Sequence, residues 1–384
     1  MRPKIQLARL LTGTKPAEAD KLIDEAIAAN PRSAEALQVK GAMLSSRGDQ
    51  EGAIRLFDQA LKIDPKNISA HLSRAEVNIV LGKYKEADED IDPILKADPS
   101  QFTANYLRGR ELFRQQKYTE ADRIFDHISP GFASFWSGYY LQGATKLMLG
   151  QYAQAEASLG KYLAHMPDDI RAARLIATAA LQQQAPSRAI EYLKPLVDRM
   201  PADAPTLAVL GNAYMADRKP DLALQQFEKA AALDPDNPAI KTQIGRSEID
   251  AGQSEQGLAT LEQVFGTEAG APIAGPTLVI RELRARRLDK AAEVAGSLIQ
   301  RDAKNPIYHT LLGVVRIAQQ DYSAAESAFR AALRSTRTSP SPHGTWRRFT
   351  RRRVERTRRE RSITICWPKT PMRVPPFWAL PTPT

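Results

Sequence analysis

A period of 34 residues runs through residues 1–333 and limits what this chain can fold into. Small residues recur at one position of the period, at spacings that are all multiples of 34: Gly41, Ala75, Gly109, Gly143, Ala177, Gly211, Gly245 and Gly313. Alanine or glycine fills a second position: Ala19, Ala53, Ala87, Ala121, Ala155, Ala189, Ala223, Gly257, Ala291 and Ala325. Proline marks a third: Pro31, Pro65, Pro99, Pro167, Pro201 and Pro235. Such a period predicts an array of repeated units rather than one globular core.

Each unit is predicted to be a pair of antiparallel helices. Apolar residues follow helical spacing between the marker positions, as in AIRLFDQALKIDP at 53–65. The small residues are expected where two helix axes approach to about 8–10 Å. Four positions after the second series, a large residue is expected to fill the wedge between units: Phe57, Phe125, Phe227 and Phe329. The proline stops the second helix, and the units stack because none can bury its apolar face alone.

This pattern resembles the tetratricopeptide repeat. The resemblance implies an all-α solenoid, a right-handed superhelix of antiparallel helix pairs, with about ten units over 1–333. One stretch departs from the pattern, FGTEAGAPIAGP at 265–276, where Pro276 enters the first helix of a unit and Val279 replaces the small residue. We expect a hinge at 265–276; a degenerate but rigid repeat is the alternative.

Residues 334–384 do not follow the period. They hold 13 Lys and Arg against two acidic residues, so they account for the formal net charge of +10 of the chain. Proline at 337, a small residue at 347 and tyrosine at 350 are due and absent, but a one-base shift of reading frame near codon 334 permits all three. We interpret 334–384 as a frameshifted, disordered basic tail. A genuine basic tail and a nucleic-acid-binding arm are the alternatives; as written, the segment should bind polyanions without specificity.

The sequence offers no catalytic motif. Its one cysteine, Cys366, excludes a disulfide framework or a cysteine metal cluster. The five histidines lack ligand spacing, and DEDIDP at 88–93 lacks the glycine and terminal glutamate of a calcium loop, so we interpret it as a solvated helix face. We expect no active site, metal or cofactor. No apolar run reaches membrane-spanning length and the first 15 residues make a poor signal peptide, so the chain as written is expected in the cytoplasm.

The concave face of the solenoid is the predicted binding surface. It is built from positions 2, 5, 9, 12 and 13 of each unit, and its central residues are Tyr106, Arg110, Phe113, Arg114, Tyr140, Leu147, Met148, Arg171, Arg174 and Leu181. Aromatic residues and arginine anchor protein interfaces, and arginine pairs with carboxylates. We expect a protein or peptide with carboxylates to bind here, and expect loss of Arg110 or Arg174 to leave folding nearly unchanged. Ordinary packing between repeats is the alternative.

The central stretch beginning SGYYLQGATKLMLGQYAQAEASLGKYLAHMPDD at residue 137 is similar to the tetratricopeptide repeat protein of bacterial exosortase (PEP-CTERM) sorting systems. That resemblance implies an exported accessory of envelope protein sorting or exopolysaccharide production. We therefore expect a non-catalytic interaction scaffold; the alternative is an accessory module of an enzyme whose catalytic part is lost beyond the frameshift. Without a following repeat, the helix around Ala324–Leu333 is expected to self-associate.

Overall fold

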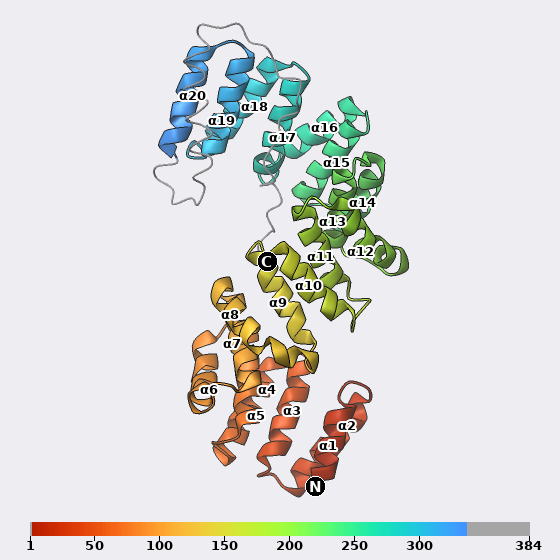
Figure 1. Cartoon of the computed structure of the whole chain (residues 1–384), viewed down its shortest axis with the longest axis vertical. Helices are drawn as coiled ribbons and strands as arrows, with labels where there is room; N and C mark the ends of the chain where they lie inside the picture. The colour runs from red at the N-terminus through yellow and green to blue at the C-terminus, as the bar shows by residue number, and fades with distance from the viewer. Residues whose placement is uncertain (1, 336–384) are drawn as a thin grey trace. The chain divides into compact units, whose positions relative to one another are not determined.

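The computed structural model describes residues 2–335, which form twenty α-helices, one 3₁₀ helix and no strand (Figure 1). The first ten α-helices are α1 (Arg2–Leu11), α2 (Pro16–Ala29), α3 (Ala34–Ser46), α4 (Gln50–Ile63), α5 (Ile68–Val80), α6 (Tyr84–Ala97), α7 (Phe102–Arg114), α8 (Tyr118–Ile128), α9 (Ser137–Met148) and α10 (Tyr152–Leu163). The others are α11 (Ile170–Gln182), α12 (Pro186–Arg199), α13 (Ala204–Ala216), α14 (Pro220–Leu233), α15 (Pro238–Asp250), α16 (Ser254–Phe265), α17 (Ala271–Arg284), α18 (Leu288–Arg301), α19 (Pro306–Ala318) and α20 (Tyr322–Ser335). The 3₁₀ helix η1 (Ser129–Ala133) precedes α9. The predicted disordered tail, apart from its first two residues, lies outside the described range.

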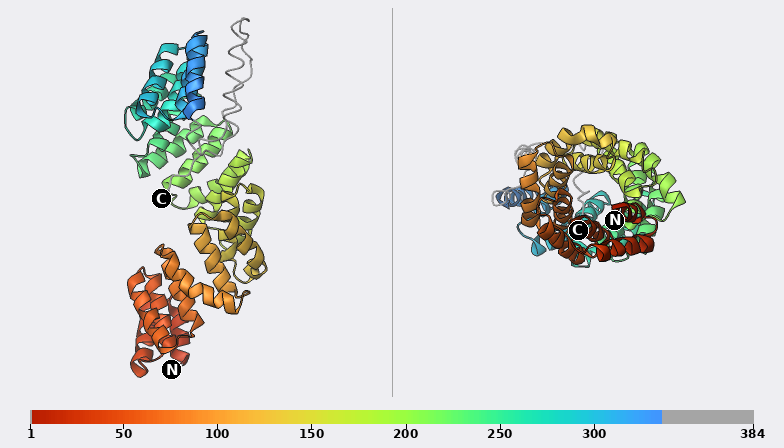
Figure 2. Two further views of the ribbon diagram at one scale, coloured as in Figure 1. Left: turned by 90° about the vertical axis from the view of Figure 1, so that its left-hand side faces the viewer. Right: turned by 90° about the horizontal axis from the view of Figure 1, so that it is seen from below.

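The helices form successive pairs, as the 34-residue period predicts. The chain divides into two compact units whose boundary lies within α11, between Ala179 and Ala180. Each odd-numbered helix packs on the even-numbered helix after it, from α1–α2 to α9–α10 in the first unit and from α13–α14 to α19–α20 in the second. Figure 2 shows the stacked pairs from two further sides. The predicted all-α repeat fold is confirmed.

The odd-numbered helices line the inner side of each unit. In the first unit α1, α3, α5, α7 and α9 each contact the next odd-numbered helix, and in the second unit α15, α17 and α19 do the same. No two successive even-numbered helices of the described residues make a comparable contact. Neighbouring pairs therefore approach most closely along their odd-numbered helices, which places the face predicted for binding on that inner side.

The small residues of the first series face a large side chain within their own pair. An ideal Cβ on Gly41 would lie 2.6 Å from Cε1 of Phe57, and one on Gly109 would lie 2.6 Å from Cε1 of Phe125. The same contact recurs between Gly211 and Phe227 and between Gly313 and Phe329. Glycine is required because the ring occupies the space of the missing Cβ. Phe57 also packs against Val77 of the next pair, as a wedge between units should.

The pair α17–α18 exchanges the large and small partners. Val279 and Ala295 hold the positions that glycine and phenylalanine hold in α3–α4, and both are fully buried in one core cluster. Helix α17 continues through Pro276 instead of ending there. The repeat is thus complete at this point, and the hinge at 265–276 stays a prediction.

The turn inside each pair repeats one backbone conformation. A residue with positive φ recurs every 34 residues from the second pair onward: Gly48, Gly82, Gln116, Gly150, Gln184, Arg218, Gly252, Arg286 and Gln320. Glycine takes this left-handed conformation without steric cost, and the five other residues show that the turn imposes it. Several helices begin with a side chain that accepts a hydrogen bond from a first-turn N–H: Ser33, Asp49, Asn67, Gln101, Asp203, Asn237 and Asn305.

A candidate protein-binding face on the odd-numbered helices

The predicted groove residues fall on three successive odd-numbered helices. Helix α7 carries Tyr106, Arg110, Phe113 and Arg114; α9 carries Tyr140, Leu147 and Met148; α11 carries Arg171, Arg174 and Leu181. All of them except Leu181 belong to the first unit. Leu181, half-buried, lies past the boundary and belongs to the second unit.

The aromatic residues of this face are half-buried and pack on neighbouring rings. The Tyr106 ring centroid lies 4.8 Å from that of Phe135, in an edge contact, and 6.3 Å from that of Phe125. Phe113 contacts Tyr118 at 5.5 Å between centroids. Burial raises the pKa of Tyr106, with the charge of Arg110 acting in the opposite direction. These rings contribute to packing between helices as well as to the inner surface.

A second aromatic group lies on α9 and α10. The ring centroids of Tyr140 and Tyr162 are 5.2 Å apart, and Trp136 stacks on His165 at 6.0 Å. The Tyr162 hydroxyl donates to Asp169 at 2.8 Å. Burial, followed by this carboxylate, raises the pKa of Tyr162 to about 12. Both tyrosines therefore stay protonated, and their rings give apolar contact.

The arginines of the groove already have partners within the chain. Arg110 pairs with Glu76 on α5 at 2.6 Å, Arg114 donates to the Val80 carbonyl at 3.3 Å, and Arg171 pairs with Asp169 at 3.3 Å. The first two contacts join α7 to α5. The expectation that Arg110 takes no part in folding is therefore corrected: its side chain ties two helix pairs together.

Sequence reasoning missed a row of polar contacts between consecutive pairs. One position of the odd-numbered helices, here called the joint position, holds Lys40, Arg74, Arg108 and Gln142 in the first unit, and each bonds an aspartate 16 residues earlier: Asp24, Asp58, Asp92 and Asp126. The aspartates lie on even-numbered helices, so each bond joins one pair to the next. Period and offset together are a signal that the sequence contains.

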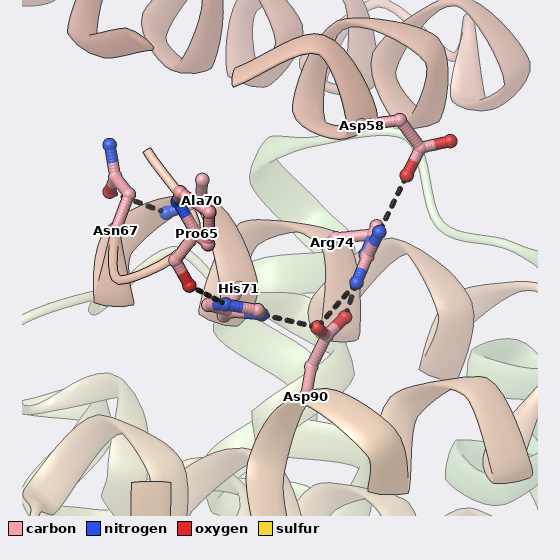
Figure 3. A network of polar contacts seen from close by, with 7 residues as sticks. All are labelled: Asp58, Pro65, Asn67, Ala70, His71, Arg74 and Asp90. Carbon is pink, nitrogen blue, oxygen red and sulfur yellow. Dashed lines mark hydrogen bonds and ion pairs between the residues drawn. The ribbon is translucent and has the colours of Figure 1, made fainter. Parts of the chain in front are cut away.

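Arg74 is the centre of the most buried of these contacts (Figure 3). Its guanidinium donates to Asp58 at 2.6 Å and, through Nη2 and Nε, to Asp90 at 2.7 and 2.9 Å. Asp90 is 1% exposed, which corrects the interpretation of 88–93 as a solvated face. A buried carboxylate without a cation would be costly, so Asp90 and Arg74 depend on each other.

His71 completes this network. Its Nδ1 lies 2.6 Å from an Asp90 oxygen and its Nε2 lies 3.0 Å from the Pro65 carbonyl oxygen. Both partners accept hydrogen bonds, so the ring makes both contacts only when both nitrogens carry a proton. His309 holds the same repeat position in the second unit, and its Nε2 bonds the Ala303 carbonyl at 2.8 Å.

The next joint places three carboxylates around one arginine. Arg108 bonds Asp88, Asp92 and Glu111, the last at 2.7 Å. Glu111 is 1% exposed. Its burial, opposed by Arg108 and reinforced by Asp88, raises its pKa to about 7. The cluster therefore holds a proton that an exposed glutamate would lose.

The described residues do not form a metal site, because no three His, Cys, Asp or Glu side chains of residues 2–335 are placed to hold an ion. Within the same range, none of the helices combines the length and apolar character needed to cross a membrane.

Comparison with protein families finds tetratricopeptide repeats over most of the chain. A model described as TPR repeat matches residues 41–82. One described as tetratricopeptide repeat matches 72–123 and 277–340, and another of that description matches 146–213 and 214–274. A search of curated proteins found no match.

Several solved structures are similar to this chain. A tetratricopeptide repeat protein from Parabacteroides merdae ATCC 43184 is 21% identical over 64% of this chain and 98% of that chain, with a TM-score of 0.45. PilW, a type IV pilus biogenesis factor, is 24% identical over 53% and 94%, with a TM-score of 0.49. The pilF protein of Pseudomonas aeruginosa is 20% identical over 57% and 97%, with a TM-score of 0.49. The repeat models, together with helix pairs that follow the same 34-residue period, show that this chain belongs to the tetratricopeptide repeat proteins.

Proposed function

We propose that this protein is a non-catalytic scaffold that binds a partner protein along the inner face of α7 and α9. The observation that carries the proposal is the contact between Arg110 and Glu76 beside the Tyr106 ring. The Arg110 side chain is 26% exposed and that of Glu76 is 53% exposed. A carboxylate from a partner can therefore replace Glu76 on the guanidinium while an apolar residue covers the ring.

Exposed apolar side chains on the same helices support an interface. Met148 at the end of α9 is 45% exposed, and Phe135, which packs on Tyr106, is 37% exposed. Apolar side chains exposed beside arginine are typical of the centre of a protein interface. An extended or helical segment that alternates apolar and acidic residues fits this face.

Site-specific photo-crosslinking tests the proposal. A photoreactive amino acid at Met148 is expected to capture the partner in cells, whereas one at Ala157, exposed on the even-numbered helix α10, is not. Replacing Arg110 and Arg174 with alanine should weaken partner binding by about 1–3 kcal/mol in total. Capture from both positions alike, or capture from Met148 that the double variant does not reduce, would remove the support for this face.

The partner is proposed to belong to a bacterial system for envelope protein sorting or exopolysaccharide production. This proposal depends on the resemblance of the stretch from residue 137 to accessory proteins of such systems. Identification of the crosslinked partner by mass spectrometry tests it, because a partner without a link to the envelope would contradict the assignment and leave the binding face standing. Self-association through α20 is a further proposal, which sedimentation of the full chain over a range of concentrations can test.

A further inference from the structure

Three arginines gather on the inner face of the second unit, away from the groove predicted from the sequence. Arg246 lies on α15, and Arg281 and Arg284 lie on α17, the next odd-numbered helix. Arg246 and Arg284 hold the repeat positions that Arg110 and Arg114 hold in the first unit. Asp250 is the carboxylate near them, and it pairs with Arg281 at 2.7 Å.

Arg246 differs from Arg110 in what its side chain contacts. Arg246 donates to the Oε1 atom of Gln243, a neutral acceptor, at 3.0 Å. In the part of the chain that the structure describes, no carboxylate lies within ion-pair distance of Arg246 or Arg284. Burial lowers the pKa of Arg246, and the charges of Arg281 and Arg284 lower it further, with Asp250 acting in the opposite direction.

The cluster therefore carries uncompensated positive charge that cannot be lost. Arginine stays protonated in proteins, so burial and like-charge repulsion destabilise the structure as long as nothing anionic binds. An anion placed among the three guanidinium groups would remove that penalty, and planar guanidinium groups can bind an oxyanion through two parallel hydrogen bonds. Ile249 and Leu283, both half-buried, lie on the same helices, which favours a ligand that also has apolar side chains.

We propose that Arg246, Arg281 and Arg284 form a binding site for the carboxylates of an acidic peptide segment in a partner protein. The site rests on the proposed scaffold function but uses a face of the second unit. It requires no change in the first unit, so the two proposals can fail separately.

The first test measures binding of a labelled peptide that alternates glutamate and leucine, using the full chain at fixed salt and fluorescence anisotropy. The variant Arg246→Gln/Arg284→Gln is expected to bind at least about tenfold more weakly than the wild type, because two charged hydrogen-bonding groups are lost. The control variant Lys229→Gln/Arg330→Gln removes two charges from the even-numbered helices α14 and α20 and should bind like the wild type. Equal loss in both variants would show a general charge effect and overturn the site.

The second test locates the bound peptide by hydrogen exchange. The peptide should slow exchange in α15 and α17 of the wild type but not of the Arg246→Gln/Arg284→Gln variant. Protection confined to other segments would overturn the proposal, as would an oligonucleotide of equal charge that protects α15 and α17 more strongly than the peptide. The photo-crosslinking result at Met148 bears only on the first unit and does not enter this test.

The third test uses thermal stability, which distinguishes a binding residue from a structural one. Without peptide, Arg246→Gln is expected to raise the melting temperature by about 2–4 °C, because a partly buried charge is removed. With peptide, the wild type should gain stability and the variant should not. A lower melting temperature for Arg246→Gln without peptide would show that Arg246 stabilises the fold and would contradict the proposal.

Discussion

At the joint position, the first unit carries Lys40, Arg74, Arg108 and Gln142, whereas the second carries Leu210, Ile244, Leu278 and Leu312. The change begins at Ile176 in α11, close to the boundary between the units. One helix pair is therefore joined to the next by directed polar bonds in the first unit and by apolar burial in the second. The same repeat backbone accepts both kinds of joint.

The two kinds of joint differ in how they fail. Leu278 is fully buried in a core cluster of the second unit, and apolar burial is insensitive to direction and to salt. A polar joint depends on geometry and on both partners, because removal of one leaves the other desolvated. We expect the first unit to respond to pH, salt and charge substitutions where the second does not.

The largest expected effect is at Arg74. Arg74→Leu should lower the free energy of unfolding by about 3–5 kcal/mol, because the Asp90 side chain, 0% exposed, loses its cation. The double variant Arg74→Leu/Asp90→Val copies the apolar character of the second unit and should recover most of this loss. Urea denaturation measures both variants, and a double variant no more stable than Arg74→Leu would contradict the equivalence of the two joints.

The apolar joint is next in size. Leu278→Ala should cost about 2–5 kcal/mol through loss of buried surface and the cavity left behind. Its cost should be the same at low and high salt, in contrast to that of Arg74→Leu. Denaturation curves at two salt concentrations check this, and a cost that changes with salt would show that the second unit also depends on charge.

The Glu111 cluster predicts a pH dependence of the first unit. Its folded-state pKa of about 7 is higher than its ordinary value of 4.5, so the folded state holds the proton more tightly than the unfolded state. The resulting contribution is complete below pH 4.5 and is lost as the pH rises to about 7, by an amount on the order of 2–3 kcal/mol. Glu111→Gln keeps a neutral side chain at all pH values and should flatten this slope between pH 5 and 7.5. An unchanged slope would show that Glu111 does not hold the proton.

The histidine pair gives the smallest expected difference. His71→Ala removes a bond to the buried Asp90 and should cost about 1–3 kcal/mol. His309→Ala at the same position of the second unit removes only the bond to the Ala303 carbonyl and should cost about 0.5–1 kcal/mol. Melting curves of the two variants can be compared directly, and equal costs would mean that Asp90 gains nothing from His71.

Much of this fold follows from the sequence, because its period identifies each helix pair and the small residue between its helices. The break at Val279 was harder to interpret, since its explanation requires the matching exchange at Ala295. Asp90 was missed because acidic runs are usually solvated, and only the position of Arg74 shows that this one is buried. Arg246 was missed although it holds an inner-face position, because the lack of a carboxylate partner is a property of space rather than of sequence.

Native-state hydrogen exchange at low and high salt tests the contrast between the units most directly. The charged joints are partly exposed, with Asp58 at 43% and Asp92 at 69% side-chain exposure, so salt can screen them. Raising sodium chloride from about 0.05 M to 1 M, where the Debye length falls to about 3 Å, should lower the opening free energies of α3 to α9 by about 1 kcal/mol. Those of α13 to α19 should stay the same or rise. An equal response in both units would contradict the account.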